Sequence, residues 1–367
     1  MPDSTTETSP RPARIGVLGG GAWGTALAVA AGRAGSQVTL WARDAAVVEA
    51  INRDHCHPRA LPGIALDPEI RASDDPAAAI VGADAVLLAV PSQAVRRVAR
   101  LAAAHAAPDL PVVICAKGIE AATDKTMVEV VAEELPGRPL AVLSGPSFAA
   151  DVAEGQPTAV ALAVDDAADA HHGPDRSLGA MLALALSNPS FRPYLTDDVA
   201  GVEIGGTVKN VIAIACGVAE GLGFGANTKA ALITRGLSEI TRLGAALGAR
   251  PETMTGLAGL GDLVLTCGST QSRNMAFGVA LGRGTPLAEA LAAGGTVEGA
   301  ANAAQVVELA RHHGVEMPIA ETVHAVVNGG LSVEQAVEAL TGRPLRAEPA
   351  ELDHVVIEPD EAPIPAP

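Results

Sequence analysis

Short apolar runs alternate with helix-like stretches along the first half of this 367-residue chain. The runs are rich in Val, Ile and Leu without a regular polar face, which predicts parallel strands buried on both sides by helices. The predicted strands are Arg14–Leu18, Gln37–Trp41, Ala85–Val90, Val112–Ala116, Leu140–Leu143 and Thr158–Val164, with a weaker one near Ile70. The predicted helices are Ala22–Gly32, Ala45–Arg53, Asp75–Val81, Val95–Ala104 and Thr126–Leu135.

The pattern changes after Thr196, where strand signals stop and long stretches rich in Ala, Gly and Leu continue to about Pro344. This change predicts two domains, a sheet domain at residues 14–196 and an all-helical domain at residues 197–345. Residues 1–13 are polar, and residues 346–367 are acidic and proline-rich. We expect both of these tails to be disordered.

A glycine-rich turn joins the first predicted strand to the first predicted helix. Gly19, Gly21 and Gly24 have the spacing Gly-x-Gly-x-x-Gly, which predicts a dinucleotide site in this strand–turn–helix context. The same spacing also occurs by chance in turns that bind nothing. The predicted fold class is therefore α/β, an N-terminal Rossmann-type, mostly parallel sheet domain followed by an all-helical C-terminal substrate domain.

Composition narrows the class of protein. Hydrophobic residues make up 49% of the chain and aromatic residues 2%, so the core must consist of small aliphatic side chains. The net charge of -17 would repel nucleic acids and anionic lipids, so we expect neither nucleic-acid binding nor membrane insertion. Four widely spaced cysteines and an N-terminus unlike a signal peptide predict a cytoplasmic protein with free thiols.

No metal site is predicted. His55 and His57 lie close together in the Asn52–Gly63 loop, but no further ligands follow at a recognisable spacing. We interpret both as surface histidines.

Polar and small residues follow several predicted strands, at Val90–Ser92, Ala116–Gly118 and Ser144–Ser147. Carboxyl ends of parallel strands share one edge of a sheet, so these segments should line one crevice with the glycine turn. Arg43 and Asp44 follow the second strand. An arginine there suits the 2′-phosphate of NADP, so Arg43 favours NADP, whereas an acidic residue suits the ribose of NAD, so Asp44 keeps NAD open. A plain solvated charge pair is the alternative.

Three features of the helical half could carry chemistry. Lys209 is a lone cation inside an apolar helix, where it could exchange protons at neutral pH, or else reach the surface or form a structural ion pair. Asp262 ends a glycine-dense stretch that predicts a tight turn, and it could orient that lysine or bind a substrate hydroxyl. Ser272, Arg273 and Asn274 are typical of a helix N-terminus, either a plain cap or a phosphate site.

In several long motifs the chain resembles the bacterial NAD(P)-dependent glycerol-3-phosphate dehydrogenase family. The resemblance runs from about Arg14 to Arg343. The chain departs from the family at Ala60, where the family often has an aromatic residue before Leu-Pro-Gly, and in its acidic tail, which the family does not match. The motifs are Gly19–Thr25, Val90–Ser92, Ala116–Glu120, Leu143–Ala149, Gly205–Ala213, Gly256–Cys267, Gln271–Asn274 and Val297–Gly299.

This resemblance implies reversible hydride transfer between NAD(P)H and dihydroxyacetone phosphate, giving sn-glycerol 3-phosphate for phospholipid synthesis. It implies Lys209 as the proton acceptor, and we expect a homodimer. The implied substrate contacts are Lys117, Gly145, Ser147, Lys209, Asp262, Ser272, Arg273 and Asn274. The implied cofactor contacts, besides the three glycines, are Ala22, Trp23, Arg43, Lys117, Ala149, Arg273, Val297 and Glu298. The alternatives are a reductase of another small keto acid and a non-catalytic NADPH sensor.

Overall fold

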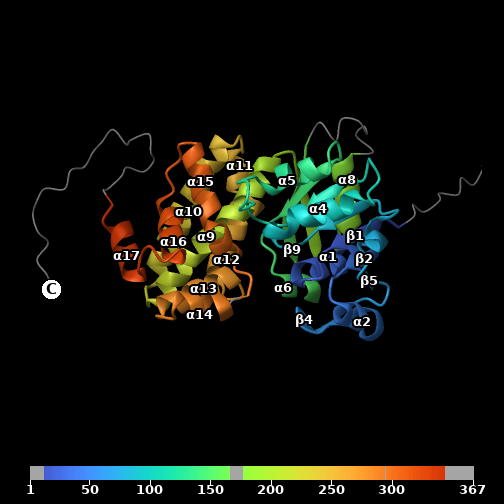
Figure 1. Ribbon diagram of the computed structural model, residues 1–367, viewed down its shortest axis with the longest axis horizontal. Coiled ribbons are helices and arrows are strands. Elements are labelled where there is room, and N and C mark those ends of the chain that lie inside the picture. The colour runs from blue at the N-terminus through green and yellow to red at the C-terminus, as the bar shows by residue number, and fades with distance from the viewer. Residues whose placement is uncertain (1–11, 166–176, 294, 344–367) are drawn as a thin grey trace, which may run out of the picture.

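The structure is a computed structural model that describes residues 12–165, 177–293 and 295–343. Of the two tails predicted to be disordered, residues 1–11 and 346–367 lie outside the described residues. Residues 12 and 13 are described. A sheet with flanking helices occupies one side of the molecule and a group of helices the other (Figure 1). The last strand of the sheet ends at Thr196, and the first helix of the helical half begins at Val199.

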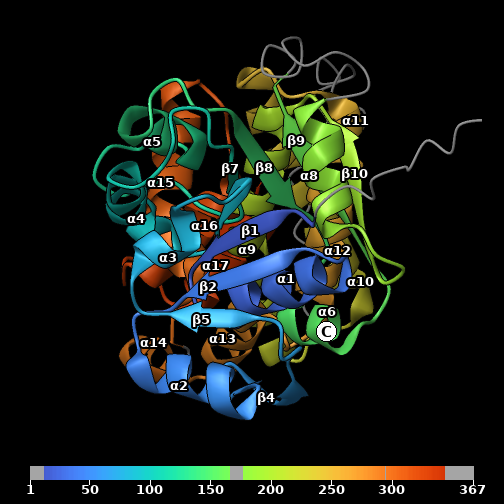
Figure 2. The same cartoon turned by 90° about the vertical axis from the view of Figure 1, so that its right-hand side faces the viewer.

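Eight strands of the described chain form one sheet, in the order β10-β9-β8-β7-β6-β1-β2-β5. Neighbouring strands are parallel except that β9 runs antiparallel to β8. Figure 2 shows β1, β2 and β5 side by side. The strands are β1 (Arg14–Leu18), β2 (Gln37–Trp41), β5 (Arg71–Ser73), β6 (Ala85–Leu88), β7 (Val112–Ile114), β8 (Leu140–Ser144), β9 (Thr158–Val164) and β10 (Phe191–Thr196).

Helices cover both faces of this sheet, because alternate residues of each central strand are buried on opposite sides. Ile15 and Val17 of β1 join one core cluster, whereas Leu18 joins the other. The first face carries α1 (Ala22–Arg33), α2 (Ala45–Asp54), α6 (Ala149–Glu154) and α8 (Leu178–Leu186). The second carries α3 (Pro76–Ile80), α4 (Val95–Ala103) and α5 (Met127–Glu134), and a 3-10 turn, η1 (Ser92–Ala94), precedes α4.

Three strands were not predicted from the sequence, and one histidine assignment was wrong. β10 pairs with β9, and the loop after α2 contains a hairpin of β3 (Cys56–His57) and β4 (Leu61–Ala65). His57 is not a surface residue, since only 2% of it is exposed. Its Nδ1 accepts from the Ala60 N–H (3.1 Å), so its Nε2 donates to Gly20 O (2.8 Å), and the hairpin is thereby fixed to the glycine-rich turn.

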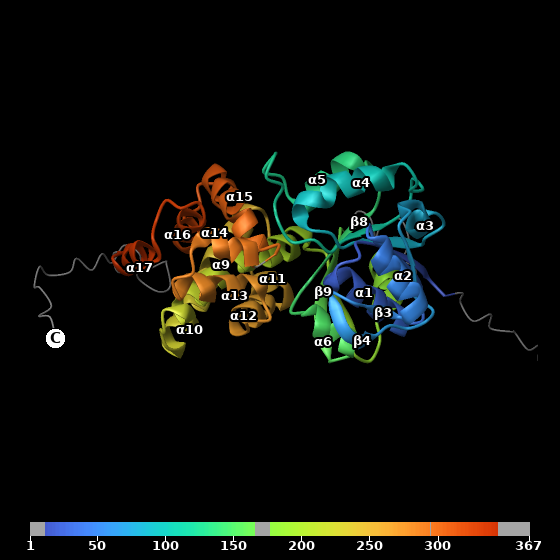
Figure 3. The same ribbon diagram turned by 60° about the horizontal axis from the view of Figure 1, so that its bottom comes forward.

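The helical half is built around α9 (Val199–Gly221), which contacts most of the other helices in that half. This helix is long and apolar enough to cross a membrane, but 89% of its apolar window is buried inside the protein, so it is a core helix. Figure 3 shows the two halves side by side. The other helices are α10 (Ala226–Ala246), α11 (Pro251–Met254), the π-helical turn η2 (Leu257–Gly261), α12 (Asp262–Gly268), α13 (Arg273–Gly282), α14 (Leu287–Ala293), α15 (Glu298–His312), α16 (Pro318–Val327) and α17 (Val333–Thr341).

A seam of glycines joins α9 to α13. A Cβ on Gly217 would lie 2.3 Å from Met275 O, and one on Gly278 would lie 2.2 Å from Ile214 O. Gly221 and Gly282 meet one turn further along in the same way. The two backbones are therefore in direct contact, closer than any larger side chain would allow.

Candidate active site

The glycine-rich turn has the geometry that a dinucleotide phosphate requires. Gly19 has a φ of +132°, which favours glycine, and a Cβ on Gly24 would lie 1.9 Å from Gly19 O. Gly21 is the N-cap of α1 and has open space where a side chain would be, so a ligand can approach the unpaired N–H groups of the first turn. The indole N–H of Trp23 is buried there without a hydrogen-bond partner among the described residues. The turn therefore fits a bound pyrophosphate.

The residues after β2 separate the two cofactor alternatives. Asp44 caps α2 by accepting from the Ala46 N–H (3.0 Å), and its other carboxylate oxygen pairs with Arg59. These bonds lower the pKa of Asp44, the Arg59 bond most. The Arg43 side chain is exposed and makes no hydrogen bond or ion pair with a described residue. An engaged carboxylate and a free guanidinium favour a ribose that carries a 2′-phosphate.

One carboxylate joins two lysines from opposite halves of the molecule. Lys209 Nζ, on α9, donates to Asp262 Oδ1 (2.6 Å), and Lys117 Nζ, after β7, donates to Asp262 Oδ2 (2.6 Å). Lys117 Nζ also approaches Gly145 O at 3.4 Å, after β8. Asp262 is 1% exposed and is the first residue of α12 rather than part of a tight turn. The predicted lysine–aspartate pair is therefore present, and Lys117 joins it from the end of β7.

Burial sets the acidity of Lys209. The side chain is buried, and this desolvation lowers its pKa to about 8, against the opposing effect of the Asp262 charge. The like charge of Lys117 lowers it further. An ammonium group with this pKa can both give and take a proton near neutral pH.

The predicted helix N-terminus at Ser272 is present. Ser272 Oγ caps α13 by accepting from the Met275 N–H (3.3 Å), and Arg273 is exposed, with no hydrogen bond or ion pair to a described residue. Burial raises the pKa of the neighbouring Glu298, although Arg273 and the two lysines oppose the shift. The arrangement leaves one guanidinium free at the positive end of a helix, where an anion is stabilised.

Asn274 makes its contacts within the protein. Its Nδ2 donates to Asn210 Oδ1 (2.9 Å), and its Oδ1 accepts from the Gly299 N–H (2.8 Å). A Cβ on Gly299 would lie 2.3 Å from Asn210 O. Asn274 thus ties the segments that carry Lys209 and Glu298 together.

The remaining predicted site residues lie at the ends of secondary-structure elements. Ser147 Oγ donates to Gly145 O (2.9 Å), and Val297 directly precedes α15. Ala22 and Ala149 open α1 and α6, and both pack against the same core cluster as Trp23. The ends of β7 and β8 meet the helical half at Lys117.

Sequence reasoning missed Thr266. Its Oγ1 lies 2.8 Å from Lys209 Nζ and 3.3 Å from Asp262 Oδ1. Thr266 stands four residues after Asp262, one helical turn along the same face, so this spacing was the signal that could have found it. The hydroxyl accepts a second hydrogen bond from the Lys209 ammonium group, beside the one to Asp262.

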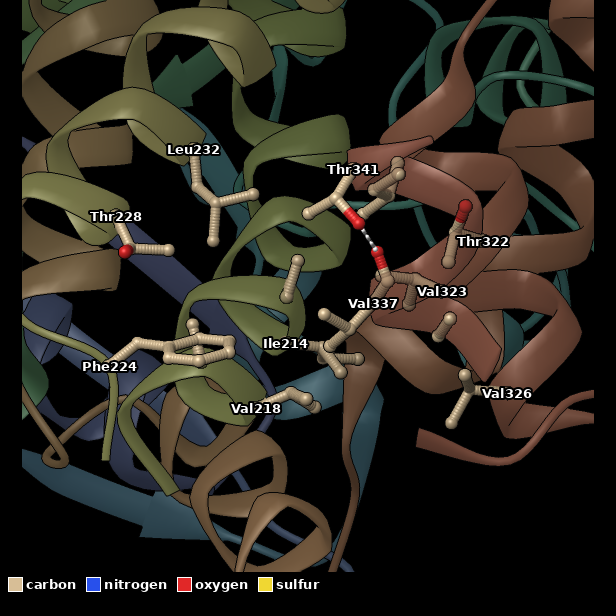
Figure 4. Close-up of a pocket in the computed structure, with 14 residues that line it drawn as sticks. Ile214, Val218, Phe224, Thr228, Leu232, Thr322, Val323, Val326, Val337 and Thr341 are labelled. Carbon is tan, nitrogen blue, oxygen red and sulfur yellow. Dashed lines mark hydrogen bonds between the residues drawn. The ribbon is translucent and has the colours of Figure 1, made fainter. Parts of the chain in front are cut away.

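A separate apolar cavity of about 110 Å³ lies between α9, α10, α16 and α17 (Figure 4). Ile214, Val218, Phe224 and Leu232 are among the residues that line it, and none of its lining residues carries a charge. It is therefore unsuited to a phosphorylated ligand, and it lies apart from the charged crevice. Among the described residues no cluster of side chains could hold a metal ion.

Comparison with known proteins assigns the family. Residues 14–170 match the N-terminal part, and residues 198–338 the C-terminal part, of NAD-dependent glycerol-3-phosphate dehydrogenase. A glycerol-3-phosphate dehydrogenase (NAD(P)+) of Rhodospirillum rubrum is 54% identical over 335 residues, which cover 91% of this chain and 93% of that protein. The chain belongs to the NAD-dependent glycerol-3-phosphate dehydrogenase family.

Other members of the glycerol-3-phosphate dehydrogenase family agree. The protein of the same name from Caulobacter vibrioides is 52% identical over 336 residues, covering 91% of this chain and 98% of that protein. The crystal structure of glycerol-3-phosphate dehydrogenase from Coxiella burnetii has a TM-score of 0.84 at 41% identity, covering 91% of this chain and 100% of that chain. The resemblance found in the sequence, and the predicted fold class, are thereby confirmed.

Proposed function

We propose that the chain is an NAD(P)-dependent sn-glycerol-3-phosphate dehydrogenase that interconverts dihydroxyacetone phosphate and sn-glycerol 3-phosphate. One observation carries the assignment. A buried lysine with a lowered pKa shares the carboxylate of Asp262 with Lys117, which follows a strand of the domain that carries the glycine-rich turn. The bound dinucleotide supplies the hydride in one direction and receives it in the other.

Lys209 moves the proton. Its ammonium group has three N–H donors, of which Asp262 Oδ1 and Thr266 Oγ1 engage two. The third is available to the carbonyl oxygen of the substrate, which gains negative charge as hydride arrives at the adjacent carbon. Lys209 donates its proton to that oxygen and recovers it when the alcohol is oxidised.

Charged groups around Lys209 orient the substrate. Asp262 holds Lys209 and Lys117 at a fixed separation, and the second ammonium group provides another donor for a substrate oxygen. Arg273, beside the Ser272 cap, suits the phosphate because a guanidinium can bind two phosphate oxygens at once. Glu298, Arg43 and the residues of the glycine-rich turn would contact the cofactor.

The wider assignments follow from this reaction. The sheet domain, residues 14–196, would bind the dinucleotide, with NADP favoured over NAD by the free Arg43, and the helical domain, residues 197–345, would bind the substrate. The product would serve phospholipid synthesis in the cytoplasm, and the enzyme would act as a homodimer.

The test follows NADPH absorbance after addition of dihydroxyacetone phosphate, with pyruvate as a keto acid that lacks the phosphate. We expect rapid oxidation of NADPH with the first compound only. Lys209→Ala should lower turnover by orders of magnitude and leave NADPH binding near normal. Equal rates with pyruvate would indicate a different reductase, no oxidation would indicate a sensor, and retained turnover in Lys209→Ala would contradict the role of this lysine.

A further inference from the structure

The loop that follows Lys117 is bonded to both halves of the molecule. Gln93, in η1 of the sheet half, donates from Nε2 to Ile119 O (2.8 Å) and accepts at Oε1 from the Ala121 N–H (3.0 Å). Asn302, on α15 of the helical half, accepts at Oδ1 from the Ile119 N–H (3.1 Å). The backbone of Ile119 is thus held on one side by each half.

The two side-chain amides also meet each other. Gln93 Nε2 lies 3.3 Å from Asn302 Oδ1, and Asn302 Nδ2 donates to Glu298 O (2.8 Å). Asn302 is 1% exposed, and a Cβ on Gly118 would lie 2.8 Å from its Nδ2. We call Gln93 and Asn302 the amide clasp.

We propose that the amide clasp positions Lys117 against Asp262. The proposal rests on the function proposed above. Lys117 is two residues before Ile119, and its ion pair with Asp262 crosses between the same two halves as the clasp. The lysine side chain alone has several rotatable bonds, so a fixed backbone is needed to keep its ammonium group in one place.

Neutral amides suit this task. Each amide offers donors and an acceptor on one side chain, which matches the N–H and C=O groups of a backbone segment. A charged side chain at either position would add its field to a crevice that already contains Lys117, Lys209, Asp262 and Glu298. Gln93 and Asn302 therefore act through Lys117 and are positioning residues.

The first variant is Gln93→Leu, because Gln93 is an exposed residue outside the hydrophobic core and its replacement should not unfold the protein. We expect kcat/KM for dihydroxyacetone phosphate to fall about tenfold or more as Lys117 loses its position. The charge of Lys117 lowers the pKa of Lys209, so a displaced Lys117 should allow that pKa to rise. The pH at which kcat/KM for reduction falls to half should therefore also rise. The matched control is Gln335→Leu, which removes a side-chain amide that accepts from the Ser332 N–H at the start of α17, away from the crevice.

A double-mutant cycle with Lys117→Met tests the route of action. If the clasp acts through Lys117, Gln93→Leu should have little further effect in the Lys117→Met enzyme. Full additivity of the two losses, or a wild-type rate and midpoint in Gln93→Leu, would overturn the proposal. Wild-type activity in Lys117→Met would instead contradict the role given to Lys117 under the proposed function.

Hydrogen exchange tests the clasp without catalysis. In Gln93→Leu, amide exchange in the 118–122 segment should be faster than in the wild type, while Gln335→Leu should leave it unchanged. Unchanged exchange in Gln93→Leu would show that the amide does not hold the loop, whatever reaction the enzyme catalyses.

Discussion

The pH dependence of catalysis should follow the ionisation of Lys209. Burial lowers the pKa of this lysine from 10.5 to about 8. A group with that pKa is about nine-tenths charged at pH 7 and about one-tenth charged at pH 9, whereas an ordinary lysine would remain almost fully charged at both. Reduction of the ketone needs the charged acid, and oxidation of the alcohol needs the neutral base.

We therefore expect kcat/KM for reduction to fall about tenfold between pH 7 and pH 9, and kcat/KM for oxidation to rise by about the same factor. Initial rates measured in both directions from NADPH absorbance, at constant ionic strength, give the two profiles. Both should share one midpoint near the pKa of Lys209. The control is Lys229→Met, which removes a surface lysine paired with Glu220 and should leave both profiles unchanged.

Asp262→Asn tests whether the charge of Asp262 raises the pKa of Lys209. The Asp262 charge raises the pKa of Lys209, so its removal should move the midpoint to lower pH. Profiles that stay flat from pH 7 to pH 9 in both directions would refute the assignment of Lys209 as the proton-transferring group. A midpoint that moves to higher pH in Asp262→Asn would refute the account of what sets its pKa.

Three further predictions concern other parts of the molecule. Arg273→Ala should raise the KM for dihydroxyacetone phosphate about tenfold or more, since charge-assisted bonds to the phosphate are lost, and an unchanged KM would remove Arg273 from the phosphate site. Arg43→Ala should weaken NADPH binding more than NADH binding in fluorescence titrations, and equal weakening would show that Arg43 does not contact the 2′-phosphate. Gly278→Ala should lower the free energy of unfolding, measured by denaturant titration, by about 1–3 kcal/mol, because its Cβ would lie 2.2 Å from Ile214 O. Gly268→Ala is the control, because a Cβ there would meet no atom within 4 Å, and it should leave the free energy of unfolding nearly unchanged.

Local patterns predicted much of the fold. β1 and β2 lie where the apolar runs placed them, and the glycine spacing gave the turn that begins α1. Lys209 is buried, as its place in a long apolar helix suggested, and Asp262 provides the anion that a buried cation needs. These features depend on neighbours in sequence, which the sequence displays directly.

Features that depend on distant partners were not predicted. The short hairpin strand β4 contains Pro62 and Gly63, which weaken any strand signal, and its position depends on His57 bonding to Gly20 O. The contact between Gln93 and Asn302 spans 209 positions, and neither side chain differs in the sequence from an ordinary polar surface residue. Only the folded chain shows that they meet.

The glycine seam between α9 and α13 limits how the enzyme can open. Because these two backbones touch at Gly217 and Gly278, neither helix can slide along the other without a clash. Lys209, on α9, and Arg273, at the start of α13, would then move together as one rigid block. A motion of one half against the other would instead separate Lys117 from Asp262, because their ion pair crosses between the halves.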